Sequence, residues 1–128
     1  MKTKTPQINI VTLGCSKNSV DSEVIAGQLN RMNIQTEHGF NNGNIVIINT
    51  CGFINDAKEE SIDTILLYKD LKKRKKIEKL YVMGCLIERY KEELSKEISG
   101  IDGWYGVNEM AKIVSDLGAE YRTSLIGE

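Results

Sequence analysis

Three cysteines each follow directly after an apolar run typical of a β-strand, and each precedes a segment with the features of a helix start. They are Cys15 in TLGCSKN, Cys51 in INTCGFIND and Cys85 in VMGCLIE, and the 128 residues contain no other cysteine. The carboxyl ends of neighbouring parallel strands meet at one edge of a sheet, where open α/β folds bind their ligands. The repeated context therefore predicts an alternating β/α fold with three thiols at one sheet edge.

Strand-like runs alternate with amphipathic helical segments along the chain. Strands are expected at 8–13, 34–37, 45–49, 80–83 and 101–105, and helices at about 19–32, at about 55–76, before Gly100 and between Asn108 and Gly118. This alternation predicts an α/β three-layer sandwich with a mostly parallel five-stranded sheet, in the flavodoxin-like order 2-1-3-4-5. Residues 38–44 are too few for a helical crossover, so an antiparallel edge strand at 34–37 remains an alternative.

The helical repeat also predicts which side chains face the core. For the first helix these are Val20, Val24, Ile25, Leu29 and Met32, and for the second they are Ile62, Ile65 and Leu66. For the third helix they are Ile87, Tyr90, Leu94 and Ile98, and for the last they are Met110, Ile113, Val114 and Leu117.

Composition and charge narrow the classes of protein that fit. A 14.4 kDa chain is one domain with room for a core, and a formal net charge of −1 gives no electrostatic case for nucleic-acid binding by the chain as a whole. The apolar runs are too short for a membrane span, and the first residues, MKTKTPQ, lack the apolar region of a secretory signal. We therefore expect a cytoplasmic protein without a membrane partner. An odd number of widely separated cysteines argues against a disulfide framework.

The cysteines have three possible roles. They could be small buried hydrophobic residues, ligands of a zinc ion with an open position, or ligands of an iron–sulfur cluster. Catalytic zinc usually has imidazole or carboxylate ligands as well as sulfur, and the single histidine, His38, is expected in a solvated loop. A three-point site made of thiolates favours an iron–sulfur cluster with one iron left open.

A basic stretch between Lys69 and Lys79 is a second candidate site. Its cations are Lys69, Lys72, Lys73, Arg74, Lys75, Lys76 and Lys79. They could contact RNA phosphates, but cations are also favoured at a helix C-terminus, which is the simpler interpretation. Nucleic-acid contact is therefore possible but has no support for this chain.

Three segments, LGCSKNSVDSE, NTCGFINDAKEESID and GCLIERYKEEL, closely resemble the N-terminal domain of radical S-adenosylmethionine methylthiotransferases. The residues after the first two cysteines are most similar to the branch that modifies an aspartate of a ribosomal protein. The resemblance covers nearly the whole chain. Ser16 differs from the proline usual in that branch, which is a minor change at a turn.

The resemblance implies specific roles. Cys15, Cys51 and Cys85 would hold an auxiliary 4Fe–4S cluster that binds or relays the sulfur to be inserted. Residues 1–118 would form this auxiliary-cluster domain, and 119–128 a linker toward a radical barrel. The barrel would carry S-adenosylmethionine and a second 4Fe–4S cluster on a CxxxCxxC motif, which this sequence lacks.

The activity implied for the full-length enzyme is methylthiolation of the β-carbon of an aspartate in small-subunit ribosomal protein twelve. This chain by itself would then have no catalytic residue and no radical chemistry. Two alternatives remain, namely the same domain of a tRNA methylthiotransferase and a cluster-free module that binds a ribosomal partner through the basic stretch.

Overall fold

The computed structural model describes residues 7–13, 16–31, 35–38, 45–51 and 55–117. Its elements are β1 (Gln7–Thr12), α1 (Ser16–Arg31), β2 (Gln35–His38), β3 (Ile45–Thr50), α2 (Asn55–Lys73), β4 (Lys79–Gly84), α3 (Cys85–Glu97), β5 (Gly103–Tyr105), the 3₁₀ turn η1 (Val107–Glu109) and a last helix at 110–117. The predicted alternation of strands and helices is confirmed.

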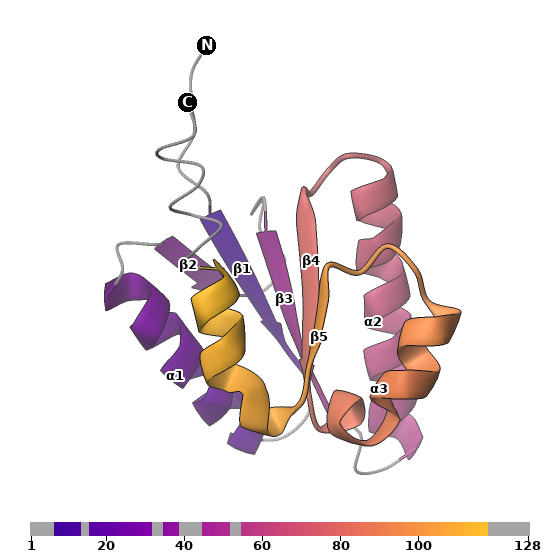
Figure 1. Cartoon of the computed structure of the whole chain (residues 1–128), viewed down its shortest axis with the longest axis horizontal. Helices are drawn as coiled ribbons and strands as arrows, with labels where there is room; N and C mark the ends of the chain where they lie inside the picture. Colours follow the sequence, from indigo (N-terminus) through magenta and orange to yellow (C-terminus); the bar gives the residue numbers. More distant parts are fainter. Residues whose placement is uncertain (1–6, 14–15, 32–34, 39–44, 52–54, 118–128) are drawn as a thin grey trace.

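The strands form one sheet in the order β2-β1-β3-β4-β5, and every neighbouring pair is parallel. This is the predicted flavodoxin-like order, and β2 is a parallel rather than an antiparallel edge strand. Helix α1 and the helix at 110–117 cover one face of the sheet, while α2 and α3 cover the other (Figure 1). The predicted α/β class and its three layers are confirmed.

The core consists of two clusters, one on each face of the sheet. One cluster joins the strands to α1 and the last helix through Ile8, Ile10, Ile25, Leu29, Ile45, Ile47, Tyr81, Met83, Ile113 and Leu117. The other joins them to α2 and α3 through Val11, Val46, Ile48, Ile65, Tyr68, Leu80, Val82, Leu86, Ile87 and Leu94. All six residues of β3 are buried because helices cover both faces of this central strand.

Two predicted core positions are wrong. Val24 on α1 is 41% exposed and Leu66 on α2 is 44% exposed. Each residue adds about 100° around a helix, so only a stripe of side chains can face the sheet. On α2 that stripe contains Ile65 and Tyr68, and Leu66 is turned out of it. The side chains of Val20 and Met32 lie outside the described part of the chain.

Some predicted boundaries also differ. Helix α1 begins at Ser16, three residues before the predicted start, and His38 is the last residue of β2 rather than part of a loop. Helix α2 ends at Lys73, because Lys75 adopts a left-handed backbone with φ of 64° and the N–H of Lys76 donates to the C=O of Leu71 at 2.9 Å.

Candidate metal centre

Strands β3 and β4 bring two of the three cysteines to the same edge of the sheet. Thr50 pairs with Gly84 in the parallel register, and Cys51 and Cys85 directly follow these last residues of the two strands. Both cysteines are thiols outside any disulfide, with exposed fractions of only 4% and 8%. Cys15 lies outside the described residues, so the third predicted ligand is not placed.

Gly84 controls how closely the two cysteine-bearing segments approach. Its φ of 114° and ψ of −168° belong to a region that is essentially restricted to glycine. A Cβ at this position would lie 2.5 Å from the C=O oxygen and 2.8 Å from the amide nitrogen of Thr50. Glycine therefore allows β4 to turn directly into α3, whose first residue is Cys85.

Ser61 on α2 contacts the backbone of Cys51 twice. Its Oγ accepts a hydrogen bond from the N–H of Cys51 at 3.0 Å and donates one to the C=O of the same residue at 2.9 Å. Ser61 is fully buried. The main chain at Cys51 is thereby tied to α2 immediately after β3 ends.

Further buried polar groups connect the strand ends. Ser22 on α1 forms a hydrogen bond with the hydroxyl of Thr12 at 2.7 Å and accepts one from Nδ2 of Asn49 at 3.0 Å. The hydroxyl of Thr50 donates to the C=O of Met83 at 2.7 Å, across β3 and β4. Sequence reasoning missed this network, although Asn49 and Thr50 directly before Cys51 were a visible polar signal at the end of an apolar strand.

The donor chemistry of this edge fits a soft-metal cluster. Cys51 and Cys85 offer two sulfur ligands from adjacent strand ends, and thiolates suit iron–sulfur clusters. Within the described ranges, no three His, Cys, Asp or Glu side chains gather closely enough to hold a metal ion. A three-thiol site therefore requires Cys15.

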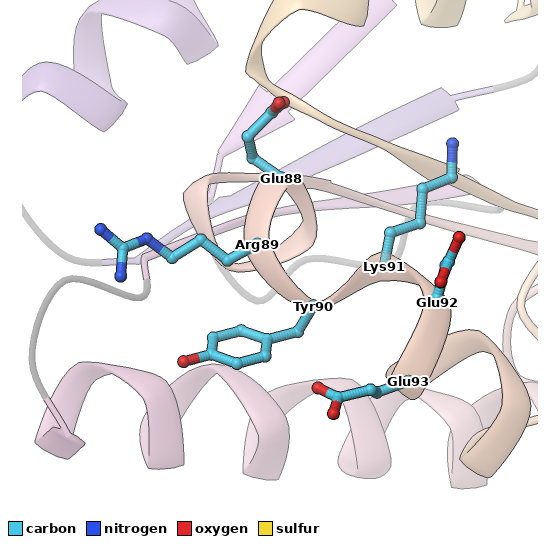
Figure 2. A pocket seen from close by; sticks show the side chains of 6 residues that line it. All are labelled: Glu88, Arg89, Tyr90, Lys91, Glu92 and Glu93. Atoms are coloured by element: carbon cyan, nitrogen blue, oxygen red, sulfur yellow. The ribbon is translucent and has the colours of Figure 1, made fainter.

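A hollow of about 560 Å³ lies along α3 and is lined by Glu88, Arg89, Tyr90, Lys91, Glu92 and Glu93. It accompanies a kink, because Tyr90 has non-helical backbone angles (φ −124°, ψ 22°) within α3. Figure 2 shows that these side chains point in different directions and do not converge on one point. The Nζ of Lys58 lies 4.1 Å from the centre of the Tyr90 ring, so Tyr90 connects α3 to α2 by a cation–π contact. The hollow therefore lies at the kink of α3, and its lining side chains do not converge on a common point (Figure 2).

The basic stretch lies at the opposite end of the sheet, around the connection from α2 to β4 at the top of Figure 1. Lys72 forms an ion pair with Asp102 at 2.8 Å and donates to the C=O of Gly100 at 2.8 Å. Arg74 pairs with Asp70 at 3.0 Å, one helical turn away. The prediction of cations at a helix C-terminus is confirmed for Lys72 and Lys73, which lie in the last turn of α2, whereas Lys79 lies on β4.

Beyond β5, two acidic side chains hold the last helical segment in place. Burial raises the pKa of Tyr105, and a 2.7 Å hydrogen bond to Asp116 raises it further. The phenol therefore stays protonated and donates this hydrogen bond. A 2.8 Å hydrogen bond from the N–H of Gly106 lowers the pKa of Glu109, with a smaller contribution from Lys91. Both contacts are structural.

None of the helices in the described part of the chain has the length and apolar character that a membrane span requires.

The fold and its cysteine-bearing edge define a parallel α/β domain with two buried thiols, Cys51 and Cys85, at the carboxyl ends of adjacent strands. The chain belongs to the family described as "Uncharacterized protein family UPF0004", whose profile matches residues 7–106.

Comparison with similar proteins confirms the resemblance that the three cysteine motifs indicated. The chain is 50% identical over 125 residues to "Ribosomal protein uS12 methylthiotransferase RimO" of Flavobacterium psychrophilum, covering 98% of this chain and 29% of the relative. Proteins of the same name from Cytophaga hutchinsonii and Chloroherpeton thalassium are 50% and 44% identical, each over 100% of this chain and 30% of the relative. The chain thus spans about three tenths of the length of these relatives.

Among solved structures, the fold is similar to the receiver domain of the Francisella response regulator 1452. The TM-score is 0.60 at 16% identity, over 93% of this chain and 98% of that one. This likeness concerns the fold alone.

Proposed function

We propose that this chain is the auxiliary-cluster domain of an enzyme that methylthiolates ribosomal protein uS12. The observation that carries the proposal is the register of β3 and β4, in which Cys51 and Cys85 follow the paired residues Thr50 and Gly84. Two buried thiols at one sheet edge, in a chain about half identical to uS12 methylthiotransferases, support a sulfur-ligand site.

In this proposal Cys15, Cys51 and Cys85 hold a 4Fe–4S cluster, which when bound supplies an open iron for a sulfur ligand. The residues of the chain hold the thiols at fixed positions and exclude water from them, since both described cysteines are almost fully buried. Residues 1–118 form the domain and 119–128 the linker.

The remaining parts of the reaction belong to the longer protein. A second 4Fe–4S cluster and S-adenosylmethionine would act in a further domain, and the substrate would be the β-carbon of an aspartate in uS12, modified in the cytoplasm. The names of the relatives favour uS12 over tRNA as the substrate. This chain by itself is expected to bind a cluster without catalysing the transfer.

Anaerobic reconstitution with iron and sulfide tests the ligand assignment. The wild-type chain should become brown, with charge-transfer absorption near about 400 nm. The triple variant Cys15→Ala, Cys51→Ala, Cys85→Ala should bind no cluster. Equal iron in both proteins would contradict the assignment.

The substrate is tested separately, by mass spectrometry of uS12 and of tRNA from cells that lack the full-length gene. The proposal predicts that the methylthio group is lost from uS12 and retained on tRNA. Loss from tRNA with modified uS12 would favour the tRNA alternative.

A further inference from the structure

We propose that Ser61 is a positioning residue for Cys51, because its two hydrogen bonds fix the direction in which the end of β3 presents this thiol to a metal cluster. The inference rests on the proposed role of Cys51 as a cluster ligand. It concerns a residue on α2, ten positions away in the sequence.

Both hydrogen bonds of the Ser61 hydroxyl go to the same residue, Cys51. A serine hydroxyl has one donor and two acceptor sites, and Ser61 uses its hydrogen on the C=O of Cys51 and a lone pair on the N–H of Cys51. Since the N–H and the C=O flank the same Cα, the two bonds restrain both backbone torsions of Cys51. A hydroxyl that only anchored α2 to the sheet would need one of them.

The position of Cys51 explains why these bonds are needed. Thr50 is the last β3 residue in the ladder with β4, so Cys51 lies just beyond the regular pairing. Its backbone is nevertheless buried with its side chain, and a buried N–H or C=O without a partner is costly. Ser61 supplies the hydrogen-bond partners that the sheet no longer provides.

Ser61 also differs from its neighbours on the sheet-facing side of α2. Ile65 and Tyr68 on this side belong to the apolar core, whereas Ser61 is equally buried and polar. A buried hydroxyl at this position is unfavourable unless it is hydrogen-bonded. The hydroxyl is therefore matched to the backbone of Cys51 rather than to the packing of the helix.

Groups that orient a metal ligand without touching the metal affect the metal site measurably, typically by 10- to 100-fold in affinity. Loss of the Ser61 hydroxyl would let the main chain at Cys51 rotate and would change the approach of its sulfur. We therefore expect weaker cluster retention and an altered cluster spectrum, while the thiol itself is still present.

The test compares Ser61→Ala with wild type after anaerobic reconstitution, by the rate of iron loss to a chelator and by the electron paramagnetic resonance spectrum of the reduced cluster. Ser61→Ala should lose iron about 10- to 100-fold faster, with shifted g-values. Ser61→Thr, which keeps the hydroxyl, should restore both properties.

Thr64→Ala is the matched control. Its hydroxyl lies on the same helix and donates to the C=O of Glu60 at 2.8 Å, in an exposed position, rather than to Cys51. This variant should behave as wild type. If Ser61→Ala matches wild type in both rate and spectrum, the positioning role is wrong.

A second measurement needs no variant. In the metal-free wild-type chain, the amide hydrogen of Cys51 should exchange slowly with deuterium, because Ser61 accepts it in a buried site. Exchange at the rate of an unprotected amide would overturn the inference even if Ser61→Ala failed to fold. A wild-type chain that takes up no iron would instead contradict the proposed function, whereas identical clusters in wild type and Ser61→Ala contradict only the role of Ser61.

Discussion

The two ends of the same parallel sheet use polar residues in opposite ways. At the carboxyl ends of the strands, hydroxyl and amide side chains such as Ser22, Asn49 and Ser61 are buried and hydrogen-bonded to one another or to the backbone. At the amino ends, charged side chains form ion pairs with Asp102 that remain 22–38% exposed. One end is held by buried hydrogen bonds and the other by partly solvated charges.

This difference shows where the molecule fixes its geometry. Buried hydrogen bonds have a narrow geometry and are costly to break, whereas exposed ion pairs contribute little and are screened by salt. The cysteine edge is therefore the precisely arranged end of the sheet. The basic end tolerates change, and its cations Lys72 and Arg74 already have acidic partners within the chain.

The largest effect is expected at Gly84. Gly84→Ala should lower the free energy of unfolding by about 3 kcal/mol or more, because a Cβ is strained at this φ and meets the backbone of Thr50. Chemical denaturation monitored by circular dichroism measures the loss. Gly27→Ala is the control, since a Cβ there would have no neighbour within 4 Å apart from the local helix backbone, and the helix should gain about 0.5–1 kcal/mol. A Gly84→Ala chain as stable as wild type would remove the reason for glycine at this turn.

The second-largest effect is expected for Ser22→Ala, which should lower the free energy of unfolding by about 1–3 kcal/mol. The substitution removes the hydrogen bonds to Thr12 and Asn49 inside the protein, where water cannot replace them. Urea denaturation gives the value. A change below about 0.5 kcal/mol, the range of ordinary surface substitutions, would mean that the network does not stabilise the edge.

Substitution of Asn9 on β1 should raise the free energy of unfolding rather than lower it. Its side chain is fully buried, and neither its nitrogen nor its oxygen has a hydrogen-bond partner in the described part of the chain. Asn9→Val should therefore stabilise the fold by about 1 kcal/mol, because an unpaired buried amide is replaced by an apolar side chain suited to a strand. The same denaturation experiment measures it, and a loss as large as that of Ser22→Ala would show that Asn9 is satisfied.

At the amino ends the effects should be smaller. Lys72→Met should lower the free energy of unfolding by at most about 1 kcal/mol. At high salt most of this difference between the variant and wild type should disappear. Lys73→Met, next in the sequence and exposed, is the control and should be neutral. Denaturation at low and high ionic strength decides it. A cost above that of Ser22→Ala would reverse the contrast between the two ends.

The smallest effect is a dependence on pH at Glu109. The N–H of Gly106 and the charge of Lys91 lower the pKa of Glu109 from 4.5, so its contribution to stability is present above that pH and is lost as the pH falls through the folded-state pKa. Glu109→Gln should lose less stability than wild type between pH 7 and pH 3. Parallel losses in the two proteins would contradict this assignment.

Much of the arrangement was predictable from the sequence because it depends on local patterns. The apolar runs before Cys51 and Cys85 predicted strands, and alternation with helices predicted a parallel sheet whose carboxyl ends meet. The hydrogen bonds of Ser22 and Ser61 were not predictable, because serine within a helix is usually solvated and its partners depend on packing between distant segments. The same holds for the kink at Tyr90 and for Leu66, since hydrophobicity does not specify which side of a broad apolar arc faces the sheet.

The central claim is the proposal that Cys15, Cys51 and Cys85 bind a cluster. Counting iron per chain after anaerobic reconstitution tests it most directly. Wild type should hold about four iron atoms per chain. Each of Cys15→Ala, Cys51→Ala and Cys85→Ala should hold clearly fewer, and His38→Ala should equal wild type. Iron content that is unchanged by the cysteine substitutions, or a wild-type chain that binds none, would contradict the account.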